Sequence, residues 1–429
     1  MLKFDYKNLD KKIDVHSVIK KYQKDVNKII KDMNEGRGAG SHMLGWRNID
    51  KLYPPREIKR IKECVNKWKK AGIKDLIIIA IGGSFVGTKA AVNMVNGLYG
   101  DPINIYFINN MSSNYMLQIA NKLNKSQKKF GIICVSKSGT TLEPAIGFRI
   151  FRELLINNIG KDKSREFIIC ITDGSKGTLY NYAKAKGYTM FSVPDDIGGR
   201  FSTLSPVGIV PMAFAGLDIE KILQGAKKAL TDLNTSDLYE NSAYLYAVLR
   251  HYFYKNKNFP MEMILVYEPQ LQMLAYQSQQ LFAESEGKGH SSLYPVYAVL
   301  STDLHSVGQY LQEGPRNFFE TTIMIEKPQY DMKIKIDNND DGLKYLNNKN
   351  LYDLTKKAFE GTVYAHHVDG GINNLIVTLS KADEYHYGYW FIWNSLAAVL
   401  SAYLLKHNPF DQPGVENYKK QMFSLLGKK

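Results

Sequence analysis

The run LIIIAIGGSFVG at residues 76–87 decides how the first half of the chain folds. Its apolar part, Leu76 to Ile81, shows no polar alternation, which predicts a short strand buried on both faces of a sheet. Gly82 and Gly83 follow at once and allow a sharp turn into a helix. A strand of this kind is typical of a parallel sheet that helices cover on both sides.

Similar apolar runs recur along the chain, and helix-like segments separate them. In the first half they are Ile103–Ile108, Ile132–Val135, Phe167–Ile171 and Tyr188–Val193. Helical patterns dominate from Asp218 to Tyr254, and further runs follow at Met263–Tyr267, Thr322–Ile325 and Leu375–Leu379. This alternation predicts the α/β class, with two doubly wound αβα sandwich domains and a C-terminal helix.

The predicted secondary-structure pattern changes at a few points along the chain, and these points predict the domain boundaries. We expect an N-terminal helical segment over residues 1–45, a first domain over 46–205, a second over 206–407, and a C-terminal helix within 408–429. The apolar stretch from Tyr389 to Leu405 is shorter than the roughly 20 apolar residues of a membrane span, so it predicts a buried helix. The mixed charges after Met1 do not resemble a signal peptide.

The composition excludes several classes of protein. The chain has 429 residues, 44% hydrophobic and 23% charged, which is ordinary for a globular protein and excludes disordered, collagen-like and disulfide-rich chains. Of its three cysteines, Cys134 and Cys170 lie in apolar runs and predict buried thiols, and so sparse a count fits a reducing cytoplasm. The net charge is +14, and the basic residues are spread along the chain without a known nucleic-acid-binding motif. We therefore expect no nucleic-acid partner and no membrane partner.

The segment Ser136-Lys137-Ser138-Gly139-Thr140-Thr141 follows a predicted strand and precedes a predicted helix. Hydroxyls, an ammonium group and free backbone N–H groups at one helix start form an anion cradle, suited to a phosphate monoester. One hydroxyl could serve as a helix cap, but four could not. The turn at Gly82 and Gly83 also lies at the carboxyl end of a strand, where open α/β sheets bind ligands. Taken alone, that turn could equally be a simple strand-to-helix connection.

The segment Asp196-Ile197-Gly198-Gly199-Arg200-Phe201-Ser202 is a further candidate. Two glycines before an arginine would let the guanidinium reach into a cleft near a ligand. A surface turn with an exposed arginine is the equal alternative.

The second half of the chain offers candidates for proton transfer. Gln280 and Glu284 share a helix face, and Gly287 ends that helix, so the negative end of the helix dipole should raise the pKa of Glu284 as a general base requires. His305, shortly after Thr302 or Asp303 as a helix cap, could be a neutral imidazole that exchanges protons with sugar hydroxyls. A solvated glutamate and a core or surface histidine are the plain alternatives.

The sequence predicts no metal site. His366 and His367 are adjacent rather than one helical turn apart. The segment from Asp337 to Gly342 matches the start of an EF-hand loop, but Asn348 stands where the bidentate glutamate should be, so we expect a surface loop.

Together these motifs resemble the phosphoglucose isomerase family over about residues 44–427. The most specific stretches are 196–208 and 410–419, and the segments 284–288 and 136–141 also match in type and order. The resemblance implies two sugar-isomerase (SIS) domains and the reversible conversion of D-glucose 6-phosphate to D-fructose 6-phosphate through a cis-enediol, a step of glycolysis and gluconeogenesis. It also implies no metal or redox cofactor.

The resemblance further assigns roles to single residues. It implies Glu284 as the base between C2 and C1, His305 and Lys419 in ring opening and hydroxyl proton handling, and Arg200 as stabiliser of the developing oxyanion. The implied substrate-binding residues are Ser136, Ser138 and Thr141 for the phosphate, with Lys137, Thr140, Gly83, Ser84, Gly199, Gln280 and Gln412. Family members are homodimers in which the histidine comes from the neighbouring subunit, so we expect the same of His305.

Two alternatives stay open from the sequence. A related SIS-domain isomerase could act on another sugar phosphate, or on mannose 6-phosphate as well. A sugar-phosphate sensor would need the phosphate cradle but not Glu284, His305 and Lys419 together.

Overall fold

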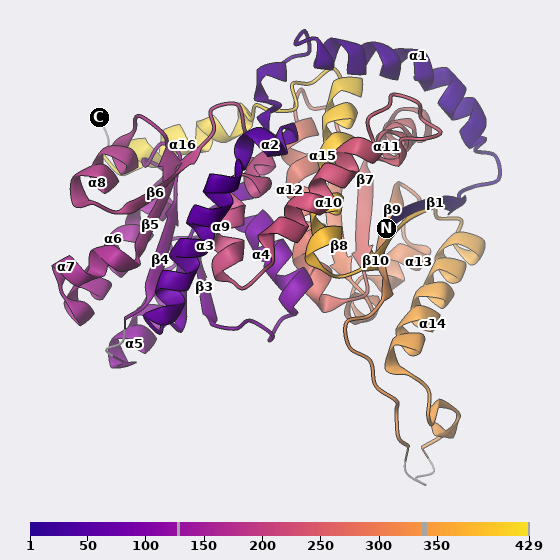
Figure 1. The fold of residues 1–429 in the computed structure, drawn as a ribbon. Helices are drawn as coiled ribbons and strands as arrows, with labels where there is room; N and C mark the ends of the chain where they lie inside the picture. The colour runs from indigo at the N-terminus through magenta and orange to yellow at the C-terminus, as the bar shows by residue number, and fades with distance from the viewer. Residues whose placement is uncertain (127–128, 337–340, 428–429) are drawn as a thin grey trace. The chain divides into compact units, whose positions relative to one another are not determined.

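A computed structural model describes residues 1–126, 129–336 and 341–427 (Figure 1). The chain forms two compact units. The contiguous unit comprises Gly40–Leu230, and the discontinuous unit comprises Met1–Ala39 with Thr231–Lys429. Most of the expected EF-hand-like loop, residues 337–340, lies outside the described residues.

The sheet of the contiguous unit contains the strands predicted from the apolar runs. They are β2 (Asp75–Ile79), β3 (Asn104–Ile108), β4 (Gly131–Val135), β5 (Ile168–Asp173) and β6 (Thr189–Val193). All pair in parallel in the order β3-β2-β4-β5-β6. The order reverses direction between β2 and β4, which is the mark of a doubly wound sheet and the usual place of a ligand site. The predicted α/β class is therefore confirmed.

Helices connect these strands or flank the strand-containing segment in the sequence. The main ones are α3 (Pro55–Lys70), α4 (Gly83–Asn96), α5 (Ser113–Ser126), α6 (Leu142–Ile159), α8 (Thr178–Lys186), α9 (Pro206–Phe214) and α10 (Ile219–Asp232). Helix α9 packs on α3 and α4, so the contiguous unit continues beyond the boundary predicted at residue 205. Cys134 and Cys170 are buried in β4 and β5, as predicted, and burial raises the pKa of the Cys134 thiol to about 12.

The sheet of the discontinuous unit repeats the same winding. Its strands are β7 (Met261–Val266), β8 (Tyr294–Val299), β9 (Phe318–Lys327), β10 (Asn374–Lys381) and β1 (Leu2–Asn8), in the order β1-β10-β9-β7-β8. Strands β7 to β10 are parallel and take the same relative order as β2 to β5 in the other sheet, read from the opposite edge. The repeated winding agrees with two α/β sandwiches.

Two strands of this sheet were not predicted. Strand β1 pairs antiparallel with β10, so the expected N-terminal helical segment was wrong for residues 2–8, although α1 (Val15–Asn34) follows. The physical reason is the alternation of Leu2, Phe4 and Tyr6 with charged residues, which suits a half-buried edge strand. Strand β8 lies at the opposite edge, where Pro295 is tolerated because edge strands leave some N–H positions unpaired.

Helices pack around this second sheet as well. They are α11 (Ser242–Lys257), α12 (Gln272–Glu286), α13 (Gly308–Glu313), α14 (Leu351–Tyr364), α15 (Glu384–Leu404) and α16 (Gly414–Leu425). Most of α15 is buried and packs against α1, α11 and α12, which confirms the predicted core helix. None of the helices in the described parts of the chain is long and apolar enough to cross a membrane.

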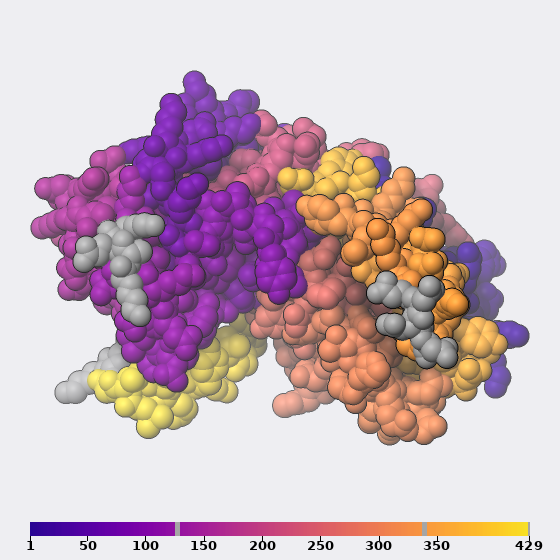
Figure 2. Space-filling model, turned by 90° about the horizontal axis from the view of Figure 1, so that it is seen from below, coloured from indigo at the N-terminus to yellow at the C-terminus, as the bar shows by residue number. Residues whose placement is uncertain are grey.

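Large apolar side chains are exposed in the described residues between β9 and α14. This segment, orange in Figure 2, exposes Tyr330, Met332 and Tyr345.

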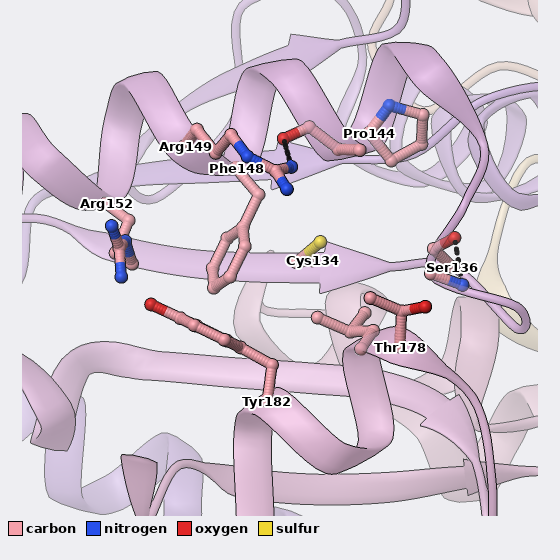
Figure 3. Close-up of a pocket in the computed structure, with 11 residues that line it drawn as sticks. Cys134, Ser136, Pro144, Phe148, Arg149, Arg152, Thr178 and Tyr182 are labelled. Carbon is pink, nitrogen blue, oxygen red and sulfur yellow. Dashed lines mark hydrogen bonds between the residues drawn. The ribbon is translucent and has the colours of Figure 1, made fainter. Parts of the chain in front are cut away.

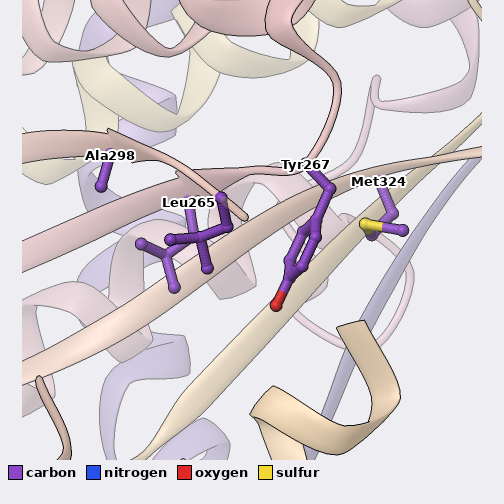
Figure 4. Packing of buried hydrophobic residues seen from close by; sticks show 5 residues of the cluster. Leu265, Tyr267, Ala298 and Met324 are labelled. Carbon is purple, nitrogen blue, oxygen red and sulfur yellow. The ribbon is translucent and has the colours of Figure 1, made fainter. Parts of the chain in front are cut away.

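A small apolar cluster of Leu265, Tyr267, Ala298, Leu300 and Met324 packs at the carboxyl ends of β7, β8 and β9 (Figure 4). The partly buried Leu304 and Phe359 pack against the same cluster, which thereby fixes the chain just after β8.

Candidate active site

The loop between β4 and α6 is folded around its own hydroxyl groups. The buried Ser136 Oγ accepts a hydrogen bond from the Gly139 N–H at 3.1 Å, and the Ser138 Oγ accepts one from the Thr140 N–H at 3.2 Å. The Ser138 and Thr140 hydroxyl oxygens lie 2.9 Å apart. Gly139 has φ of +74°, a conformation that favours glycine and lets the loop turn back on itself. Three of the predicted cradle hydroxyls therefore lie within one turn.

Helix α6 begins directly after this loop. Thr141 is the N-cap residue, and its side chain makes no capping hydrogen bond. The first N–H groups of a helix have no partner within the helix, and the helix dipole makes that end favourable for an anion. The loop and the helix start thus offer hydroxyl and N–H donors of the kind a phosphate requires.

Lys137 lies apart from the hydroxyl groups. Its ammonium donates to the Pro194 carbonyl oxygen at 3.2 Å and forms an ion pair with the Asp195 carboxylate, also at 3.2 Å. The side chain thereby links the β4–α6 loop to the segment after β6. In this arrangement the Lys137 ammonium contacts the segment after β6 and does not donate to the hydroxyl groups of its own loop.

The two glycine turns that the sequence singled out meet in the contiguous unit. Gly82 has φ of +58°, and α4 begins at Gly83 with the half-buried Ser84 in its first turn. A Cβ added to Gly83 would lie 2.3 Å from the carbonyl oxygen of Gly199 and 2.6 Å from the Cα of Arg200. Only glycine fits so close a contact between two backbone segments.

This contact fixes the backbone that carries Arg200. Arg200 is only 4% exposed, and its guanidinium carbon lies 5.6 Å from the centre of the Phe201 ring. Phe201 stacks on Trp46, so a rigid aromatic pair supports the segment. A surface turn with an exposed arginine, one of the two alternatives from the sequence, does not describe this residue.

Helix α12 carries the proposed base. The Gln280 amide donates to the Glu284 Oε1 atom at 2.9 Å, which confirms that the two side chains share a helix face. Two residues further on, Glu286 is completely buried and ion-paired with Arg250, and burial raises the pKa of the Glu286 carboxyl. The helix end next to Glu284 is therefore held from inside the unit.

Arg250 is the centre of a buried polar network that sequence analysis missed. Its Nε donates to Glu262 Oε2 at 2.7 Å, and its Nη1 donates to the Ser401 hydroxyl at 2.8 Å in addition to Glu286. Glu262 also accepts hydrogen bonds from Tyr246 and Thr321. These residues come from helices and strands that are far apart in the sequence, so no local pattern could reveal the network.

Lys288 links the end of α12 to the segment that precedes the C-terminal helix α16. Its ammonium donates to the carbonyl oxygens of Ser285 and Asn408 and lies 3.2 Å from the Asp411 carboxylate. Gln412 follows directly, and α16 carries Lys419, whose ammonium donates to Glu416 at 2.8 Å. Lys288 thus ties the end of α12 to the segment before α16, a link that the sequence did not predict.

His305 lies after the carboxyl end of β8, the strand adjacent to β7. It is exposed and is the last residue of a short 3₁₀ helix, Thr302–His305. His305 thus lies in a single helical turn, but the N-cap residue is Ser301 rather than the expected Thr302 or Asp303. Asp303 accepts a hydrogen bond from the Val299 N–H at 2.7 Å and so ties this turn to the strand end.

The described residues offer no cluster that could hold a metal ion. Within 1–126, 129–336 and 341–427, no three His, Cys, Asp or Glu side chains gather as metal ligands would. His366 instead contacts Glu320 at 2.7 Å inside the discontinuous unit. The chemistry available at the candidate site is that of hydroxyls, amides, carboxylates and cationic side chains.

The repeated doubly wound sheets and the polar loops at their strand ends define an α/β protein of the class that binds small ligands where its strands end. The sequence model of the family described as phosphoglucose isomerase matches residues 57–318. Glucose-6-phosphate isomerase of Mycoplasma mycoides subsp. mycoides is 44% identical over 99% of this chain and 98% of its own. The chain therefore belongs to the phosphoglucose isomerase family.

Solved structures support the same fold. A hypothetical protein of Thermus thermophilus superposes with a TM-score of 0.87 at 28% identity, over 99% of this chain and 100% of the other. A glucose-6-phosphate isomerase of Chlamydia trachomatis has a TM-score of 0.81 at 20% identity, over 99% of this chain and 88% of the other. The resemblance drawn from the sequence motifs is thereby confirmed at the level of family and fold.

Proposed function

We propose that this chain carries out the reaction of its family with the residues described above: the reversible isomerisation of D-glucose 6-phosphate and D-fructose 6-phosphate through a cis-enediol. The observation that carries the proposal is the match to glucose-6-phosphate isomerases over nearly the whole chain, at 44% identity. The Gln280–Glu284 pair at the end of α12 supplies a carboxylate held for proton transfer.

In this proposal the substrate is bound through its phosphate. Ser136, Ser138 and Thr141 donate to the phosphate oxygens, together with N–H groups at the start of α6. Thr140 and Lys137 support the loop, Gly83 and Ser84 contribute from the start of α4, and Gly199, Gln280 and Gln412 complete the substrate-binding set. Binding of the phosphate is equal in the ground state and the transition state, so it acts on affinity more than on the chemical step.

Glu284 is the base that moves a proton between C2 and C1 of the open-chain sugar. The hydrogen bond from the Gln280 amide to one carboxylate oxygen orients the Glu284 carboxylate for this proton transfer. The oxygen at the neighbouring carbon gains negative charge as the enediol forms, and the Arg200 guanidinium stabilises it. Such a charge is best stabilised by a group that is already fixed, as the buried Arg200 is.

His305 and Lys419 open the sugar ring and exchange protons with its hydroxyl groups. His305 does so from the partner subunit of a homodimer, which its exposed position permits. The proposal needs no cofactor, and it places the enzyme in the cytoplasm, where its sugar phosphate substrates are made and used.

A coupled assay tests the proposal: purified protein is given glucose 6-phosphate, and fructose 6-phosphate formation is followed. We expect turnover in both directions. Turnover of a different sugar phosphate alone would replace the assigned substrate, and absence of any turnover with intact phosphate binding would favour a sensor.

Mixing His305→Ala and Glu284→Ala subunits tests the shared site. Hybrid dimers should regain activity, because one of their two sites would then contain both residues. No recovery, with hybrids shown to form, would contradict the placement of His305.

A further inference from the structure

A cavity of about 140 Å³ lies inside the contiguous unit, beside the β4–α6 loop. Helix α6 forms one wall, α8 forms the opposite wall, and Cys134 of β4 forms the floor (Figure 3). Phe148 and Leu179 make most of the lining apolar. A space of this size is similar to apolar cavities that accept a benzene-sized ring.

Two guanidinium groups give this apolar space a positive rim. Arg149 and Arg152 lie one turn apart on α6, and both line the cavity (Figure 3). The Arg149 Nη1 donates to the Ala145 carbonyl oxygen at 2.8 Å. The Arg152 Nε is buried and has no hydrogen-bond partner, although its guanidinium lies 5.3 Å from the centre of the Tyr182 ring.

An unpaired buried N–H on a cationic group is costly, and an anion would remove that cost. Among the described residues that line the cavity, none carries a carboxylate. The apolar interior and the cationic rim therefore favour a ligand with an apolar ring and one negative charge. We infer that this cavity binds a small aromatic carboxylate, with the ring against Phe148 and Leu179 and the carboxylate on Arg152.

An occupant of the cavity would also touch the β4–α6 loop. Ser136 and Gly139 belong both to the loop and to the cavity wall. The Thr178 N–H donates to the Ser138 carbonyl oxygen at 3.2 Å, and a Cβ on Gly139 would lie 2.3 Å from the Leu179 nitrogen, so loop and α8 are tightly packed. The carboxylate therefore changes the affinity of the loop for phosphate, a step that rests on the proposed phosphate-binding role of the loop.

Calorimetric titration of the whole protein with benzoate tests the site, with neutral benzamide as the matched ligand. We expect saturable binding of one benzoate per chain and at least tenfold weaker binding of benzamide. Arg152→Gln should weaken benzoate at least tenfold, and Ala145→Leu should abolish binding by filling the cavity. Arg165→Gln removes an exposed arginine of the same unit that pairs with Asp162, and it should leave binding unchanged.

Three results would overturn the inference: no saturable benzoate binding, equal binding of benzamide, or unchanged benzoate affinity in Arg152→Gln. The benzamide and Arg152→Gln comparisons still decide the matter where circular dichroism shows that Ala145→Leu is unfolded. The link to the loop is tested by repeating the titration with inorganic phosphate present. Each ligand should change the affinity of the other by the same factor, and independent binding of both would refute the link but not the cavity site.

Discussion

Replacing Arg250 with methionine should lower the free energy of unfolding by about 3–5 kcal/mol, the range for removing one partner of a buried ion pair. Arg250, Glu262 and Glu286 are all completely inaccessible to solvent. Methionine fills much of the space but leaves two buried carboxylates without their shared cation. It also removes the donor of the 2.8 Å hydrogen bond to Ser401.

Equilibrium urea denaturation, followed by circular dichroism, measures this loss. Lys357→Met is the matched control, because it breaks an exposed pair with Glu360 in the same unit and should cost less than about 1 kcal/mol. A loss below about 1 kcal/mol in Arg250→Met would refute the reasoning, since it would mean that the two carboxylates are not left uncompensated.

The same variant should show a changed dependence on pH. Burial raises the pKa of the Glu286 carboxyl, so the folded state binds this proton more readily than the unfolded state does. Stability from such a group is present below the unfolded pKa and is lost as the pH rises through the folded pKa. In Arg250→Met the guanidinium no longer opposes the rise in the pKa of Glu286. The loss of unfolding free energy relative to the unmodified protein should therefore be larger at about pH 8 than at about pH 5.

Further predictions concern the two loops and the approach to α16. Ser136→Ala removes the acceptor of the Gly139 N–H and a phosphate donor, so KM for the sugar phosphate should rise by about tenfold or more with a smaller change in kcat; a change in kcat alone would contradict the assigned role. Gly83→Ala places a Cβ 2.3 Å from the Gly199 carbonyl oxygen and should lower the unfolding free energy by about 1–3 kcal/mol, measured by urea denaturation; no loss would show that the two turns are not in contact. Lys288→Met releases the segment before α16 from α12, so kcat should fall while binding of inorganic phosphate stays unchanged; an unaltered kcat would remove Lys288 as a positioning residue.

The parallel sheets could be predicted because buried strands leave a local signal. Runs such as Leu76–Ile81 and Ile132–Val135 are apolar throughout, and both became central strands. The two edge strands that were missed, β1 and β8, carry less of that signal. β1 alternates between apolar and charged residues, and β8 contains Pro295 and is only partly buried.

In the candidate site, too, the features with a local sequence signal could be predicted and those formed by distant segments could not. The β4–α6 loop and the Gln280–Glu284 pair are short-range features, so spacing in the sequence was enough to identify them. The burial of Arg200 and the ion pair of Lys137 with Asp195 depend on segments that meet only in the folded chain. The Arg250 network was beyond prediction for the same reason.

The central claim is that the Glu284 carboxylate moves the proton between C2 and C1. Glu284→Gln should lower isomerisation by about 10²–10⁴-fold and abolish deuterium uptake at the sugar carbon from D₂O, because an amide cannot act as a base. Glu313→Gln is the control, since Gln309 donates to Glu313 on α13 in the same spacing, at 2.6 Å. Near-normal deuterium uptake by Glu284→Gln, with inorganic phosphate still bound, would contradict the account.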